Sequence, residues 1–245
     1  MATDAQIPPE IRPAPVVETP LLAPWWHTAS LIAVLLFASL NGMRGRHSLA
    51  VHSRLPQYLW GMTWEWILLA FTWLGIRKRI NLRQLIGGGW ASMEDFLLDV
   101  VYACAFWVCA LFVLGIGAKL MHLDEAGKIE SMRKQLGFLT PGSKVELAVW
   151  FCMSATAGFC EEIIFRGYLQ RQFAASTNSV LAGTLLSAAV FGAAHGYEGV
   201  ARMVLIGIYG LMFGLLAAWR KSLRPGMMAH AWHDALSGAV LRMLR

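Results

Sequence analysis

The sequence predicts an all-α protein, a polytopic transmembrane bundle of about seven helices, and three observations lead to this fold class. Hydrophobic residues make up 57% of the 245 residues and charged residues only 15%, whereas a soluble domain has about 25% charged residues. Apolar runs follow one another along the whole chain. They lack the alternating pattern of transmembrane β-strands, and helices are the other structure that satisfies the backbone in lipid. The seven runs span 23–42, 57–76, 96–118, 147–169, 179–195, 203–219 and 225–244.

The charge pattern is that of a membrane protein. The net charge of +6 is modest, and the basic residues fall between the apolar runs, as they do in membrane loops. We therefore expect the lipid bilayer as a partner and no nucleic acid. Lys and Arg are divided almost evenly between the loops on the two sides of the membrane. Their distribution therefore does not determine the orientation of the chain in the bilayer.

The chain divides into three parts. Residues 1–22 are rich in Pro and Ala and predict a disordered N-terminal tail. Residues 23–144 hold three apolar runs, followed by a polar segment with apolar residues at helical spacing. That segment suits a short helix on the membrane surface, and an ordinary amphipathic connector fits equally well. A turn and cap ending at Ser143 then precede a four-helix core over 145–245.

Two adjacent glutamates, Glu161 and Glu162, follow fourteen uncharged residues in the fourth run. A charge at bilayer depth costs from ~3 to over ~10 kcal/mol, so such groups usually face a wet or protein-lined cavity. On a helix, Glu162 lies four residues before Arg166, which is the favourable order for an ion pair. We expect Arg166 to hold Glu162 and Glu161 to remain available for chemistry. The alternative is that the helix ends at Cys160 and the pair lies in a wet loop.

Two later runs contain histidines. His195 closes the fifth run, four residues after Phe191, and His230 lies four residues before Asp234 in the seventh. Residues four apart share one helix face, and a carboxylate beside a histidine can fix its tautomer for catalysis or metal binding. It can equally be a polar clasp, and His195 alone can be a hydrogen-bonded structural histidine.

Other features of the runs have simpler explanations. His233 follows the first histidine of its run by three residues, a spacing that without further zinc ligands is a weak metal signal. Gly210 and Gly214 predict a close helix-packing face. Glu65 and Asp99 could line the same cavity as the acidic pair, but we expect them to be structural or close to a loop.

The combination is more specific than its parts. Glu-Glu-x-x-x-Arg at 161–166, Phe-x-x-x-His at 191–195 and His-x-x-x-Asp at 230–234 together resemble the CAAX-processing and bacteriocin-processing (CPBP or Abi) family of intramembrane proteases. Its eukaryotic members are the type II CAAX prenyl endopeptidases of the endoplasmic reticulum. The resemblance covers about 145–240, and the first three runs carry no matching motif. It departs at Asp234, where the eukaryotic enzymes carry Asn.

The resemblance implies an intramembrane endopeptidase. Glu161 would be the general base that activates a water, and His195 would assist that water or stabilise the oxyanion. Peptide hydrolysis needs both a base and a donor for the developing negative oxygen. The implied catalytic residues are Glu161, His195, His230 and Asp234, and the supporting residues are Glu162, Arg166 and Phe191.

The sequence leaves the use of a metal open. Glu161, His195 and His230 could hold Zn²⁺ with one position left for water. Alternatively, the glutamate and the histidines activate the water without a metal. The resemblance favours the glutamate-centred alternative, so zinc is the one cofactor that the sequence brings into consideration.

The implied substrate is a peptide or protein in the membrane, which can be lipidated, and the implied location is the inner membrane of a bacterium. Two other function classes also fit these residues. One is a non-catalytic protein of the same fold, acting in bacteriocin immunity or as a partner of a secretion system. The other is a proton-coupled transporter with Glu161 and the histidines as a relay. Polar groups retained at depth argue against a purely binding role.

Seven simple spans would not easily assemble this site. His195 ends one helix near one face, whereas His230 lies early in a helix that begins at the opposite face. We therefore expect a helix to start or stop inside the membrane. The segment 222–228, with Pro225 and Gly226, is the best candidate, because irregular backbone is tolerated at depth where protein surrounds it.

Overall fold

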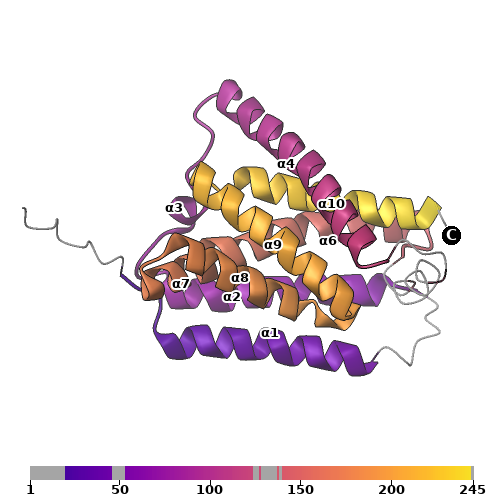
Figure 1. Ribbon diagram of the computed structural model, residues 1–245, viewed down its shortest axis with the longest axis horizontal. Coiled ribbons are helices and arrows are strands. Elements are labelled where there is room, and N and C mark those ends of the chain that lie inside the picture. Colours follow the sequence, from indigo (N-terminus) through magenta and orange to yellow (C-terminus); the bar gives the residue numbers. More distant parts are fainter. Residues whose placement is uncertain (1–19, 46–52, 124–126, 128–136, 138–139, 244–245) are drawn as a thin grey trace, which may run out of the picture.

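The computed structural model (Figure 1) describes residues 20–45, 53–123, 127, 137 and 140–243, and these residues form helices and no strand. Each predicted apolar run falls on a helix or on helices joined end to end, which confirms the all-α bundle. The helices are α1 (Trp25–Gly45), α2 (Leu55–Ile76), α3 (Leu82–Ile86), α4 (Met93–Leu120), α6 (Lys144–Glu161), the π-helix η1 (Glu162–Leu169), α7 (Gln170–Thr177), α8 (Val180–Ala194), the 3₁₀ helix η2 (Gly196–Glu198), α9 (Val200–Arg220) and α10 (Arg224–Met243). The predicted tail lies outside the described residues except at its end, as does most of the predicted surface helix.

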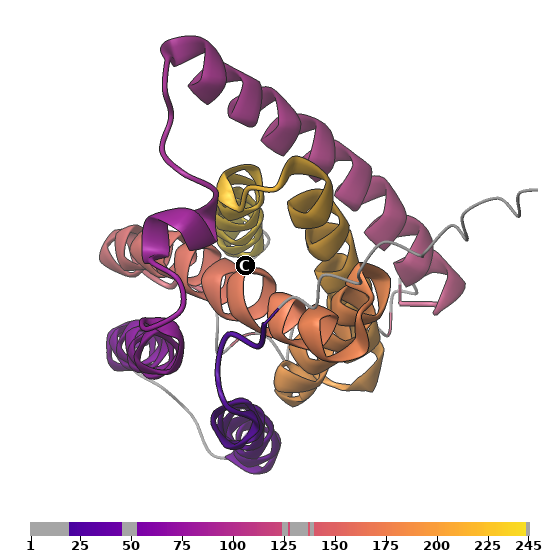
Figure 2. The ribbon, with the colours of Figure 1, turned by 90° about the vertical axis from the view of Figure 1, so that its left-hand side faces the viewer.

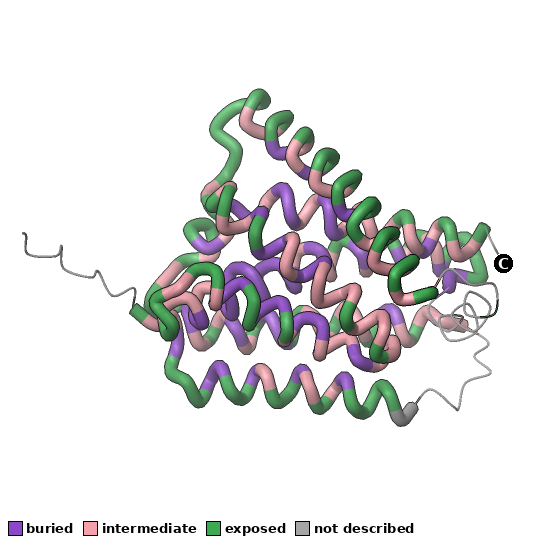
Figure 3. The backbone as a smooth tube through the Cα atoms, in the orientation of Figure 1, coloured by how far each residue is buried: buried purple, intermediate pink, exposed green. Residues whose placement is uncertain are grey.

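Four stretches of helix are long and apolar enough to cross a bilayer, so the chain is an integral membrane protein. They are Trp25–Met43, Met93–Leu120, Lys144–Thr177 and Val200–Arg220. The other three predicted runs form helices that are shorter or less apolar; α8, with 15 residues, is below the ~20 needed to span. Much of the outer surface of α1 and α4 is exposed (Figure 3) and includes large apolar side chains such as Phe37 and Phe112, which suit contact with lipid tails.

The central element is the helix that runs from Lys144 to Thr177 through α6, η1 and α7. α2 and α10 pack along α6, whereas α8 packs against α7 and is covered by α9 (Figure 1). α1 and α4 lie on opposite sides of this assembly, and α4 crosses α9 and α10 obliquely (Figure 2). Ser143 caps the start of α6 by accepting a hydrogen bond from the Glu146 amide at 3.1 Å, as the sequence predicts.

α6 and α10 come into close backbone contact at Gly158. A Cβ at this position would lie 2.8 Å from both the backbone nitrogen of Ala231 and the carbonyl oxygen of Met227. Because both atoms are backbone, no side-chain rotation can relieve the clash. Gly158 therefore allows the contact that brings α10 against α6.

Gly158→Ala is expected to lower the free energy of unfolding by ~1–3 kcal/mol, the usual cost of overpacking. The matched control is Gly115→Ala in α4, where an added Cβ meets no atom within 4 Å. That control is expected to be neutral or slightly stabilising, because Ala favours a helix over Gly. Unfolding in mixed micelles measures both, and equal effects would contradict the close approach.

The predicted glycine packing face is confirmed. A Cβ at Gly210 or Gly214 would come within 2.8 and 2.6 Å of side chains of α8. The carbonyl groups of the same two glycines accept hydrogen bonds from the central helix, at 3.1 Å from Arg166 Nη2 and 3.0 Å from Gln170 Nε2. The small residues therefore bring α9 close to its neighbours and also supply acceptors for buried polar side chains.

The irregular backbone expected near 222–228 is the turn between α9 and α10. Lys221 takes a left-handed conformation (φ 51°), and α10 then begins at Arg224 and continues through Pro225 and Gly226. Ser222 and Leu223 in this turn are buried, and the Leu223 amide donates to the Ile86 carbonyl at 2.9 Å. The break thus precedes Pro225 and does not interrupt α10.

Asp99 anchors this turn to α4. Its side chain is fully buried, with Arg224 Nε at 2.7 Å, Arg220 Nη2 at 3.6 Å and the Trp90 indole donating at 3.0 Å. Buried charges are found where such partners compensate them. Asp99 is therefore a structural residue, as the sequence predicts, and does not belong to the cluster around the acidic pair.

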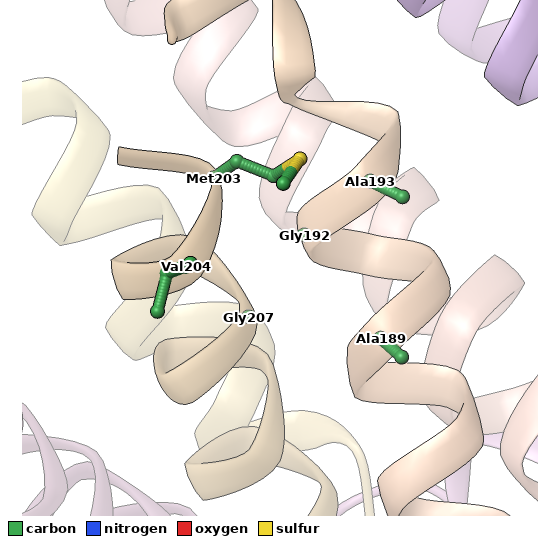
Figure 4. A pocket seen from close by; sticks show the side chains of 6 residues that line it. All are labelled: Ala189, Gly192, Ala193, Met203, Val204 and Gly207. Carbon is green, nitrogen blue, oxygen red and sulfur yellow. The ribbon is translucent and has the colours of Figure 1, made fainter. Parts of the chain in front are cut away.

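A small apolar cavity of about 200 Å³ lies between α8 and α9 (Figure 4). It is lined by Ala189, Gly192, Ala193, Met203, Val204 and Gly207. None of these side chains carries a charged or hydrogen-bonding group, so the cavity offers no chemistry of its own.

Candidate active site

The acidic pair lies where the central helix changes from α to π geometry. α6 ends at Glu161 and η1 begins at Glu162, and all eight residues of η1 are buried. The helix does not end at Cys160, so the wet-loop alternative is wrong. The structure also corrects the expectation of one regular α-helix over 147–169, because its last eight residues form a π-helix. π-helical turns are rare and occur frequently at functional sites. The wider turn changes the directions of the side chains that follow Glu161.

Glu162, Arg166 and His230 form the buried base of the site, each at most 4% exposed. Arg166 Nη1 donates to Glu162 Oε1 at 2.8 Å, so the expected ion pair is present. His230 Nδ1 lies 3.1 Å from the same oxygen. A carboxylate can only accept, so His230 Nδ1 carries the hydrogen and Nε2 faces the remainder of the site.

Glu161 lies between two imidazoles. Its Oε1 is 3.9 Å from His195 Nε2 and its Oε2 is 3.6 Å from His230 Nε2. Both distances exceed those of a direct hydrogen bond, and at such separations a bridging water can connect the groups. The structure therefore brings residues from α6, α10 and the end of α8 to one point.

Phe191 orients His195 and contacts Arg166. Its carbonyl oxygen lies 2.9 Å from His195 Nδ1, and since a carbonyl only accepts, this nitrogen carries the hydrogen. His195 Nε2 is thereby directed to Glu161. The Phe191 ring lies 4.3 Å from the Arg166 guanidinium carbon, a cation–π contact.

Asp234 occupies the outer edge of the cluster. Its Oδ2 is 3.6 Å from His230 Nε2, and its side chain is 32% exposed, the highest value among the predicted catalytic residues. His230 Nε2 therefore lies near both Asp234 and Glu161. His233 does not join this group, because its ring packs on Tyr209 at 4.9 Å between centroids.

The donor set does not fit a zinc ion in this arrangement. Within the described part of the chain, no three His, Cys, Asp or Glu side chains are placed so that they could hold a metal. Glu161 directs one oxygen to each imidazole, over the two long distances given above. The participation of zinc stays a prediction, and no chemical step below passes through a metal.

Two residues near the acidic pair, Glu65 and Tyr197, were not predicted from the sequence as members of the site. We expected Glu65 to be structural or close to a loop, but its carboxyl contacts that of Glu161. The sequence did contain a signal for a functional Glu65, because it is the one charged residue in its apolar run. Tyr197 follows His195 in η2, with the two rings 5.8 Å apart. Burial and the nearby Glu198 carboxyl raise the pKa of Tyr197, so its phenol keeps its proton.

The fold and the site define an integral membrane protein with a buried glutamate–histidine cluster. A family model described as Type II CAAX prenyl endopeptidase Rce1-like matches residues 143–236. This part of the chain is therefore similar to the Rce1-like family of type II CAAX prenyl endopeptidases, which confirms the resemblance predicted from the motifs. The comparisons with curated proteins and with solved structures gave no significant match.

Proposed function

We propose that this protein is an intramembrane endopeptidase that hydrolyses a peptide bond of a membrane-associated peptide or protein with a water activated by Glu161. The observation that carries the proposal is the position of the Glu161 carboxyl, 3.9 and 3.6 Å from imidazole nitrogens of His195 and His230. The other nitrogen of each imidazole has a fixed partner, so both rings are oriented. The Rce1-like family match over 143–236 supports the same class of reaction.

The reaction requires a base, and Glu161 is the side chain available for that role. Glu161 takes one proton of the water as the water oxygen attacks the carbonyl carbon of the substrate. It then returns this proton to the leaving amide nitrogen, and the C–N bond breaks. A positioned general base contributes about 10²–10⁴-fold to such a step. Glu162 is unsuited to this role because Arg166 and His230 already bind its Oε1.

The histidines and Tyr197 serve the water and the oxyanion. His195, with Nδ1 donating to Phe191, has Nε2 free to accept a hydrogen from the attacking water. His230 is held by Glu162 through Nδ1, and its Nε2 lies 3.6 Å from both Glu161 and Asp234, where it can contact the attacking water. Tyr197, which keeps its phenol proton, is the donor that we propose for the oxyanion.

The substrate class follows from the surroundings of the site. The predicted catalytic residues lie in the central helix, in α10 and at the end of α8, inside a bundle whose outer helices are apolar. A substrate that is itself held in the membrane, by a lipid group or by a transmembrane segment, would reach such a site. We propose the inner membrane of a bacterium as its location.

The test uses purified protein in phospholipid nanodiscs with three peptides. One carries a farnesylated cysteine near its C-terminus, one is the same peptide without the lipid, and one is a transmembrane peptide. Mass spectrometry of the products identifies any bond that is cut, and Glu161→Gln serves as the inactive variant. Cleavage that persists in that variant, or no cleavage of any peptide, contradicts the proposal. Proton-coupled solute uptake without cleavage would instead support a transporter.

Dialysis against a chelator is expected to leave the cleavage rate unchanged, because the proposed step uses Glu161 and the histidines without a metal. The measurement is the initial rate before and after dialysis, together with the metal content of the protein. A loss of activity that zinc restores would support the zinc alternative.

A further inference from the structure

Helix α2 lies outside the segment that the family model matches, yet it contributes a side chain to the site. α2 packs along α6, and the ring of Trp66 in α2 lies 5.9 Å from that of Phe159 in α6. These two residues are the sequence neighbours of Glu65 and Cys160. The packing therefore brings Glu65 to the part of α6 where the acidic pair begins.

Glu65 is placed as a member of the site and not as a surface residue. Its carboxyl contacts that of Glu161. One oxygen of each residue, Oε2, is buried and has no hydrogen-bond partner in the protein. Two ionised carboxylates can only accept hydrogen bonds, and like charges in contact repel each other. The contact becomes favourable when one carboxyl carries a proton and donates it to the other.

The proton belongs on Glu65 if Glu161 acts as a base. His195 and His230 lie 3.9 and 3.6 Å from the Glu161 oxygens, too far to hold its carboxyl by direct hydrogen bonds. A catalytic group that is held loosely loses rate, since a misplacement of about 1 Å can cost ~10²-fold. A donor from α2 would supply the missing constraint.

We propose that Glu65 is a positioning residue of the peptidase site, whose protonated carboxyl donates a hydrogen bond to Glu161 and holds it toward the two histidines. This inference rests on the proposed function of Glu161 as the base. It extends the site beyond the Rce1-like segment at 143–236 to an accessory helix. No covalent step is assigned to Glu65, which keeps its proton throughout the reaction.

The activity test compares Glu65→Gln with Glu65→Met. Gln keeps a donor, so its kcat is expected to stay within ~3-fold of the unmodified protein. Met removes the donor at similar size, and its kcat is expected to fall ~10- to 100-fold with little change in KM. The matched control is Glu94→Gln, which changes an exposed glutamate in the first turn of α4 and is expected to leave kcat unchanged.

Two results would overturn the positioning role. If Glu65→Met keeps its kcat, Glu161 needs no donor from α2. If Glu65→Gln is as slow as Glu65→Met, the carboxyl itself exchanges a proton and does more than hold its neighbour. Thermal unfolding of each variant in nanodiscs checks the fold. Should Glu65→Met fail to fold, the near-isosteric Glu65→Gln still decides, because the proposal requires it to be active.

An infrared measurement separates this inference from the proposed function, because it needs no substrate. The difference spectrum between the unmodified protein and Glu65→Gln is expected to contain the carbonyl stretch of a protonated carboxylic acid at neutral pH. Absence of that band would overturn the proposal even if Glu161-dependent cleavage is found. Presence of the band without any cleavage would support the Glu65 proton while the peptidase function fails.

Discussion

Glu161→Gln is expected to lower kcat for peptide hydrolysis by ~10²–10⁴-fold, the contribution of a positioned general base. Gln has nearly the same shape as Glu but cannot take a proton from water. Glu161 has no direct ion pair, since its nearest imidazole nitrogens lie 3.6 and 3.9 Å away. The substitution should therefore remove the chemistry and leave the fold, so that KM changes little. Initial rates over a range of peptide concentrations separate kcat from KM.

The Glu94→Gln variant again serves as the matched control, because the same chemical change is made at an exposed position. Thermal unfolding of both variants should agree with that of the unmodified protein. A kcat for Glu161→Gln within tenfold of the unmodified value would rule out Glu161 as the base. The buried Glu162, which already has Arg166 and His230 as partners, would then have to be reconsidered.

Arg166→Met is expected to lower the free energy of unfolding by ~3–5 kcal/mol, the cost of removing one partner of a buried ion pair. The Arg166 and Glu162 side chains are each only 1% exposed. Without the guanidinium, the Glu162 carboxylate keeps only His230, and the Gly210 carbonyl loses its side-chain donor. The cation–π contact with Phe191 is lost as well. Unfolding in mixed micelles measures the change.

The chain contains a control with the same spacing. Arg202 and Glu198 form an i,i+4 pair at 2.8 Å, as Arg166 and Glu162 do, but the Arg202 side chain is 30% exposed. Arg202→Met should therefore cost no more than ~1 kcal/mol, because exposed pairs contribute little. The double variant Glu162→Met/Arg166→Met should cost less than the sum of the two single variants, since residues in contact are coupled. Equal losses for Arg166→Met and Arg202→Met would contradict the role of burial.

Local features of the site were predictable because they depend on spacing within one helix. The Glu162–Arg166 pair is four residues apart, and so its contact required only that the segment be helical. The cap at Ser143 likewise follows from a short local pattern. The seven apolar runs predicted seven helices because lipid requires long apolar segments whose backbone groups pair internally.

The composition of the cluster was predictable only in part. The motif spacing nominated His195 and His230, and the structure brings both beside Glu161. The spacing to Asp234 favoured His230 over His233, which lies three residues further on and packs against Tyr209 in the structure. Which histidine faces the site depends on the rotation of α10 against α6, and close contacts such as that at Gly158 set this rotation.

The sequence by itself determined the helices, the membrane location, the class of residues in the site and the pairing of Glu162 with Arg166. Each of these follows from hydropathy or from a separation of a few residues, so neighbouring positions suffice. Only the tertiary structure decided that Glu65 contacts Glu161, that the central helix widens to a π-helix at Glu162, and that Asp99 anchors a distant turn. The physical reason is that the Glu65 and Asp99 contacts join helices far apart in the chain, and their geometry depends on how closely glycines and buried side chains allow the helices to pack. All eight residues of the π-helix are buried, so its geometry depends on the same packing.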